Sequence, residues 1–300
     1  MPKKKQVKKN KPIAILIISL LVLVAVFVGV VYLAKVNPLT QPQQDNIQET
    51  GFNKLATPSA TPKPTPRPNP IPAQRGKSVR VPILYYHYIG NNPNPADTVR
   101  DNLSVTPDRF DEEMGYLAKN GYSSITFDTL YASLNGNAPL PSKPIVISFD
   151  DGYTDFYFNA YPILRKYGLH AVSFIPTGLI GSGYYMNWNQ IKEIDASGLV
   201  SFQAHSVTHP NLTVLSDDQL KYQIFESKKV LQDMLGKTVN TFAYPYGISD
   251  ERAWNIVKSA GFVGAAGTWY GTIESEGTQF DMPRIRISGA IDLASFAAKL

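Results

Sequence analysis

The feature that most constrains the fold is an alternation of short apolar runs with longer amphipathic stretches. The runs "VPILYYHYI" (81–89) and "KPIVISF" (143–149) are rich in branched and aromatic residues and are bounded by turn formers, as buried strands are. Three further runs, "SSITF", "VNTFAYP" and "FVGAAG", each follow an amphipathic stretch. Strands that alternate with helices form parallel sheets, either open or closed into a barrel. We therefore expect an α/β domain from residue 79 to residue 300, with its functional loops at the carboxyl ends of the strands.

The amphipathic stretches carry signals for where their helices begin and end. Ser216 and Gln219 have the spacing of a capping box, and Gly236 follows the last apolar position of the same stretch. Ser249 and Gly261 are expected to bound the next helix in the same way.

The amino-terminal region has a different composition and predicts a different organisation. Residues 1–12 form a basic tail, and residues 13–34 contain no charge, which is long enough for one helix to cross a bilayer. Residues 35–78 are polar and rich in proline, as extended linkers are. Lysines before an apolar segment favour a cytoplasmic amino terminus, so we expect a single-pass anchor at the cell membrane and an extracellular domain. The alternative is a cleavable signal peptide.

Charge and cysteine content exclude several classes of function. The chain has 29 basic and 24 acidic residues; without the six leading lysines, 29 − 6 = 23 basic residues remain and the balance is near neutral. No nucleic acid or other polyanionic partner is therefore implied. The chain has no cysteine, so a metal site must be built from His, Asp or Glu.

Two short motifs carry the residues expected to perform chemistry. "ISFDDGY" places Asp150 and Asp151 where a strand should end, and "AHSVTHPNL" contains His205 and His209. Histidines four residues apart share one face of a helical turn. One carboxylate and two imidazoles are a familiar ligand set for a catalytic divalent ion. A second carboxylate beside them can act as a general base.

The two motifs resemble those of the polysaccharide deacetylases of carbohydrate esterase family four. In that family the first Asp of "SFDDG" is the catalytic base and the second is a metal ligand, as are both histidines of "HSVTH". The resemblance implies a distorted (β/α) barrel, with Asp150 as the base and Asp151, His205 and His209 around the metal. Zinc is the expected ion by ligand type, with cobalt, nickel or manganese as alternatives.

The sequence also departs from the common family pattern. Ala243 in "FAYPYG" stands where most members have an arginine, and no histidine follows His209 to serve as the general acid. "VPILYYHYIG" and "FAYPYG" resemble instead the permuted subgroup that acts on poly-N-acetylglucosamine, which implies His87 as the acid. Arg284 or Arg286 in "DMPRIRI" is expected to replace the missing arginine and orient Asp150.

Aromatic side chains near the motifs are candidates for stacking on pyranose rings. The expected substrate-binding residues are Tyr153, Trp188, Tyr244 and Tyr246. His170, the remaining histidine, follows a predicted helix and precedes a predicted strand, and we interpret it as structural.

These observations predict metal-dependent N-deacetylation of an N-acetylglucosamine-containing polysaccharide of the cell envelope, with release of acetate. The permuted motifs favour poly-β-1,6-N-acetylglucosamine over the N-acetylglucosamine of peptidoglycan. The same water attack would also cleave esters, as in an acetyl-xylan-type esterase. A different class of function, a catalytically silent glycan-binding protein, is the remaining alternative.

Overall fold

The computed structural model describes residues 77–94 and 96–300. The predicted basic tail, membrane anchor and nearly all of the linker lie outside these residues. Within the described part of the chain, no helix has both the length and the apolar character needed to cross a bilayer. The first strand, β1 (Ser78–Arg80), begins at the last residue assigned to the linker.

The centre of the domain is a curled parallel sheet, which confirms the predicted α/β class. Its main path runs β10-β9-β8-β7-β6-β2-β12, and β5 pairs with β6. The pairings along this path are parallel. The strands are β2 (Ile83–Tyr86), β5 (Ser123–Ser124), β6 (Pro144–Phe149), β7 (Ala171–Ile175), β8 (Val200–Ala204), β9 (Thr241–Ala243), β10 (Gly264–Ala266) and β12 (Ile285–Arg286).

The two ends of this path approach each other and form a seam. Met282, just before β12, makes an isolated parallel bridge with Ala266 of β10. The Met282 N–H donates to the Ala265 carbonyl at 2.8 Å, and the Gly267 N–H donates to the Met282 carbonyl at 2.9 Å. Since β12 also pairs with β2, the segment 282–286 lies between β2 and β10, which makes the parallel sheet curl toward closure.

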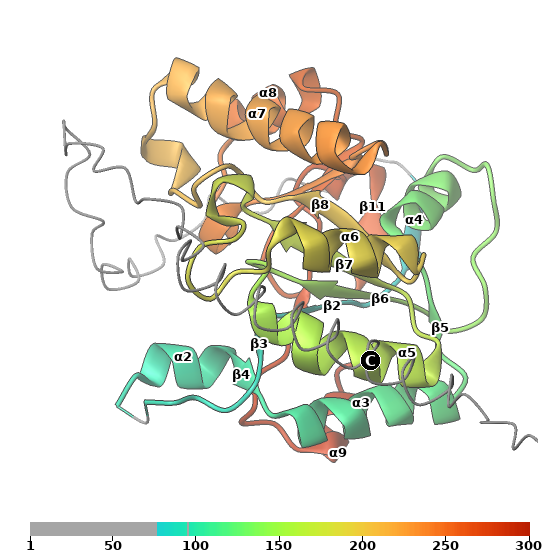
Figure 1. Cartoon of the computed structure of the whole chain (residues 1–300). Coiled ribbons are helices and arrows are strands. Elements are labelled where there is room, and N and C mark those ends of the chain that lie inside the picture. Colours follow the sequence, from blue (N-terminus) through green and yellow to red (C-terminus); the bar gives the residue numbers. More distant parts are fainter. Residues whose placement is uncertain (1–76, 95) are drawn as a thin grey trace, which may run out of the picture. The chain divides into compact units, whose positions relative to one another are not determined.

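Helices cover the sheet in two groups. In Figure 1, α3, α5 and α9 lie together on one side, and α7 and α8 pack together on another. The helices are α2 (Thr98–Leu103), α3 (Pro107–Lys119), α4 (Phe127–Leu134), α5 (Tyr161–Tyr167), α6 (Trp188–Ala196), α7 (Asp217–Leu235), α8 (Glu251–Ser259) and α9 (Leu293–Ala297). Outside the main sheet, β1 pairs with β11 (Ile273–Ser275), and β3 (Tyr88–Ile89) pairs with β4 (Ser104–Val105).

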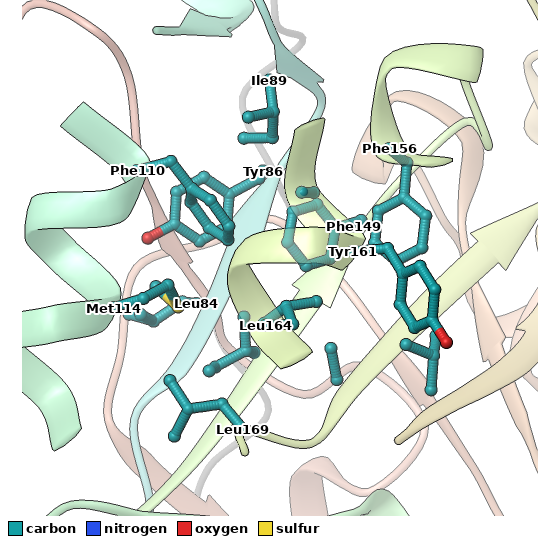
Figure 2. Packing of buried hydrophobic residues seen from close by; sticks show 14 of the residues in the cluster. Leu84, Tyr86, Ile89, Phe110, Met114, Phe149, Phe156, Tyr161, Leu164 and Leu169 are labelled. Atoms are coloured by element: carbon teal, nitrogen blue, oxygen red, sulfur yellow. The ribbon is translucent and has the colours of Figure 1, made fainter. Parts of the chain in front are cut away.

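The core beneath the carboxyl ends of β2 and β6 is aromatic. Figure 2 shows Tyr86 packed with Phe110 of α3 and Phe149 of β6. The ring centroid of Tyr86 is 5.2 Å from that of Phe110 and 5.3 Å from that of Phe149. The Tyr86 hydroxyl donates to the buried carboxylate of Glu113 at 2.9 Å. Full burial of each large ring contributes roughly 1.5–3 kcal/mol to folding. This packing fixes the positions from which Asp150 and His87 leave their strands.

Local signals predicted some boundaries correctly and others incorrectly. The capping box of Ser216 and Gln219 and the stop at Gly236 are confirmed. The strand predicted for "SSITF" is wrong beyond Ser124, because Thr126 caps α4 by accepting from the Thr129 N–H. Asp250, and not Ser249, caps α8.

Candidate active site

The chemistry-bearing residues meet at the carboxyl ends of neighbouring strands. Asp150 and Asp151 follow β6, His87 follows β2, and His205 follows β8. Because these strands are parallel, their carboxyl ends lie at one edge of the sheet. The structure thus brings together motifs that are far apart in the sequence.

Asp151, His205 and His209 form a cluster with the geometry of a metal site. Their ligand atoms all lie within 4.8 Å of one another. Asp151 Oδ1 is 3.4 Å from His205 Nε2 and 3.1 Å from His209 Nε2. The segment between the histidines is an irregular loop, so the helical turn expected from their spacing is wrong. Ser206 and His209 instead adopt positive φ angles of 68° and 57°.

The donor atoms of this cluster suit a divalent cation. The His205 Nδ1–H donates to the Ala243 carbonyl at 2.7 Å, which leaves the Nε2 lone pair directed to the cluster. Burial opposes ionisation of Asp151, but His209 and His205 outweigh it and hold the pKa of this carboxyl well below its ordinary value. Burial also opposes the charged form of His209, and Asp151 outweighs it, so the pKa of His209 is raised. An ionised carboxylate facing two imidazoles is a ligand set for zinc or a related ion.

Asp150 is held by a fully buried arginine. Arg284 Nη1 donates to Asp150 Oδ1 at 2.8 Å, and Nη2 donates to Oδ2 at 2.7 Å. The guanidinium also donates to the Ser148 hydroxyl at 3.2 Å and to the Gly267 carbonyl at 2.7 Å, and it lies over the Tyr85 ring. Burial opposes the charge of Asp150, but the Arg284 ion pair outweighs it, so the pKa of Asp150 is lowered.

The structure distinguishes between the two arginines considered for this position. Arg284 lies at the seam, between the Met282 bridge and the start of β12, and its side chain is fully buried against Asp150. Arg286 is exposed and donates to the Asn102 carbonyl. Arg284 is therefore the residue that contacts Asp150.

His87 lies where β2 gives way to β3. The run read as one strand breaks at this residue, and its Nδ1 atom is buried without a hydrogen-bond partner in the described part of the chain. Burial lowers the pKa of His87, while Asp151 and Asp150 act in the opposite direction. The charges of both carboxylates therefore act on this imidazole, and burial has the larger effect.

The predicted aromatic residues divide into two groups. Tyr246 is 49% exposed, and its ring centroid lies 4.6 Å from that of His209. Tyr153 is half-buried and stacks between Tyr88 at 3.9 Å and Tyr185 at 5.2 Å. Asp151 is among the charges acting on all four of these phenols, which places them beside the metal cluster.

Two other predictions for aromatic residues change in the structure. Tyr244 as a substrate-binding residue is wrong, because its ring is fully buried and its hydroxyl donates to the Phe280 carbonyl at 2.9 Å. Trp188 begins α6 and packs against two core clusters, so most of its ring is used for packing. His170 is exposed, and its backbone N–H donates to the Ser124 hydroxyl.

Two further tyrosines, outside the two chemical motifs, belong to the surroundings of the site. Tyr88 directly follows His87, and burial raises the pKa of the Tyr88 phenol to about 12. Tyr185 forms an antiparallel bridge with Tyr153, which brings the loop before α6 against the loop after β6. Both had a sequence signal: Tyr88 stands beside His87, and Tyr185 belongs to the aromatic-rich segment "GYYMNWNQ".

The parallel sheet gathers the Asp-His-His cluster and the ion-paired Asp150 at its carboxyl edge, an arrangement suited to metal-assisted hydrolysis. The model of the family "Polysaccharide deacetylase" matches residues 137–265, which include Asp150, Asp151 and both histidines of the cluster. The structure of the Streptococcus pyogenes deacetylase PplD in complex with acetate is similar, with a TM-score of 0.69 and 32% identity over 74% of this chain and 99% of that chain. The chain belongs to the polysaccharide deacetylase family and is an enzyme of that kind.

Curated relatives extend the comparison. YxkH of Bacillus subtilis is 29% identical over 222 residues, which are 74% of this chain and 76% of that protein. A poly-β-1,6-N-acetyl-D-glucosamine N-deacetylase of Staphylococcus aureus is 29% identical over 201 residues, 62% of this chain and 69% of that protein.

Proposed function

We propose that the protein removes N-acetyl groups from an N-acetylglucosamine-containing polysaccharide of the cell envelope, with poly-β-1,6-N-acetylglucosamine as the favoured substrate. The observation that carries the proposal is a buried, arginine-paired carboxylate, Asp150, directly beside the Asp151, His205 and His209 cluster. The similarity to the Staphylococcus aureus enzyme supports this choice of glycan.

Asp150 has the properties of a general base for the attacking water. The ion pair with Arg284 keeps its carboxylate ionised and fixes its direction, so it can accept a proton without first rearranging. Asp151, His205 and His209 would hold a divalent cation, which supplies Lewis-acid polarisation of the acetamide carbonyl and of water when it is bound.

His87 is the proposed general acid. It approaches the cluster from β2, while Asp150 and Asp151 approach it from β6. Negative charge that develops on the acetamide oxygen raises the proton affinity of a buried neighbouring imidazole. Once His87 has taken up a proton from solvent, it can donate this proton to the departing sugar amine; the C–N bond then breaks, and acetate leaves with the oxygen of the attacking water.

The product explains why an envelope location suits this chemistry. Each released amine is a cation near neutral pH, so a neutral polymer becomes a polycation. We propose that residues 13–34 anchor the protein in the cell membrane and that residues 35–78 carry the domain outside it, from the charge, apolar length and proline content of these segments.

The test is acetate release from β-1,6-linked N-acetylglucosamine oligomers, measured before chelation, after chelation and after zinc is restored. We expect release that is lost with chelator and returns with zinc, and that Asp150→Asn abolishes while metal uptake persists. Peptidoglycan fragments and acetylated xylan serve as parallel substrates. Release from one of these alone would reassign the substrate, and glycan binding without acetate release from any of them would favour a silent binding protein.

A further inference from the structure

The loop that carries both histidines of the cluster is held in an unfavourable backbone conformation. Ser206 and His209 have φ angles of 68° and 57°, in the left-handed region that residues other than glycine rarely adopt. Such conformations persist only where surrounding contacts impose them. The positions of the two imidazoles therefore depend on what contacts the backbone between them.

One side chain binds the middle of this loop from outside it. Gln223 of α7 accepts from the backbone N–H groups of Val207 and Thr208 through the same Oε1 atom, each at 2.9 Å. Its Nε2 atom donates to the Thr208 hydroxyl at 2.9 Å. Gln223 is 9% exposed, so water has little access to replace these bonds.

The opposite side of the loop is held by backbone groups. The Thr177 N–H donates to the Ser206 carbonyl at 3.1 Å, and the Gly178 N–H donates to the Val207 carbonyl at 2.8 Å. A Cβ atom at Gly178 would lie 2.9 Å from the Val207 carbonyl oxygen, so this approach requires glycine. Main-chain groups therefore hold one side of the histidine loop, and the Gln223 side chain holds the backbone N–H groups on the other side.

We propose that Gln223 is a positioning residue that presets the His205 and His209 imidazoles for a divalent cation. It touches neither histidine and acts through the two backbone N–H groups between them. Without its oxygen the buried Val207 N–H would lack a partner and the Thr208 N–H would lose its protein acceptor, so the loop would relax toward conformations in which the imidazoles diverge. The inference deepens the proposed function, because it rests on the same metal cluster.

The same helix offers a matched control. Gln232 of α7 also accepts from a backbone N–H, that of Val239, at 3.2 Å. Val239 lies before β9, at the amino end of the sheet, away from the carboxyl edge where the histidines lie. Gln232→Leu therefore makes the same chemical change on the same helix without touching the histidine loop.

The experiment measures zinc and cobalt affinity of the full chain by competition with a chromophoric chelator. Gln223→Leu is expected to weaken metal affinity about 10- to 100-fold, the usual effect of losing a group that supports metal ligands. Gln223→Glu keeps an oxygen acceptor for both N–H groups and is expected to retain the parent affinity. Gln232→Leu is also expected to retain it.

Parent-like affinity of Gln223→Leu would overturn the proposal, as would an equal loss in Gln232→Leu or a loss in Gln223→Glu. If Gln223→Leu does not fold, Gln223→Asn takes its place; it stays polar, but its shorter side chain cannot reach both N–H groups, and the same weakening is expected. Because metal affinity is measured without substrate, its outcome is separate from acetate release. If the protein does not deacetylate the proposed glycan, the conclusion about the effect of Gln223 on metal affinity is unchanged.

Discussion

Replacing Arg284 by methionine tests whether the buried ion pair governs the stability of the site. The Arg284 and Asp150 side chains are 0% and 4% exposed, so the variant leaves an ionised carboxylate buried without its counter-ion. Breaking a buried pair in this way costs about 3–5 kcal/mol. With a urea dependence of about 2–3 kcal/mol per molar, the unfolding midpoint should fall by about 1–2 M.

The matched control is Arg109→Met. Arg109 pairs with Glu112 at 2.7 Å, but these side chains are 31% and 56% exposed. This variant should therefore lose less than about 1 kcal/mol of unfolding free energy. Unfolding is followed in urea by far-ultraviolet circular dichroism with chelator present. Asp150→Asn combined with Arg284→Met should recover much of the stability, because the unpaired charge is gone. Equal midpoints for Arg284→Met and Arg109→Met, or simple additivity in the double variant, would refute the reasoning.

Three further predictions follow from other features. Burial raises the pKa of Glu113 to about 7 from an ordinary value of 4.5, so its contribution to stability is full at low pH and is lost as pH rises toward 7. As pH rises, the free energy of unfolding of the parent should fall by up to about 3 kcal/mol relative to that of Glu113→Gln. Urea unfolding of both proteins at about pH 5 and about pH 8 would measure this difference. Tyr246 has a φ angle of 59°, which glycine adopts more readily than alanine, so Tyr246→Gly should be about 1 kcal/mol more stable than Tyr246→Ala. Both variants should lower glycan affinity equally, because both lack the ring. Equal thermal stability of the two variants would contradict this reasoning. His205→Ala should abolish both zinc uptake and acetate release. After chelation, added zinc should restore acetate release by the parent but not by the variant.

The sequence was informative where chemistry follows directly from strand order. Asp150 and Asp151 come directly after the apolar run 143–149, and the carboxyl ends of parallel strands meet at one edge. The position of this pair at the functional edge was therefore predictable, whereas the strand before His205 was not recognised, because Ser201 and Gln203 interrupt its apolar residues. The conformation of the histidine loop was not predictable either, because its positive φ angles depend on contacts with α7 and with the segment after β7.

Other parts of the site depend on tertiary contacts that local patterns do not encode. Arg284 and Arg286 are two residues apart in one short motif, yet the seam buries the first and leaves the second exposed. Tyr244 and Tyr246 are likewise neighbours, and the strained turn at Tyr246 exposes only that ring. Residue type and spacing were the same in each pair, so only tertiary packing around the curled sheet distinguishes them.

The position of the seam has a consequence for how the enzyme is made. Arg284 lies 134 residues after Asp150, so the proposed base acquires its counter-ion only when segment 282–286 enters between β2 and β10. A chain synthesised only as far as β10 already contains Asp150, Asp151 and both histidines of the cluster. Such a chain, or one clipped before Met282, would lack an oriented base. Orientation of the proposed base therefore depends on the segment at the edge of the sheet path and not on the strands that carry the metal ligands.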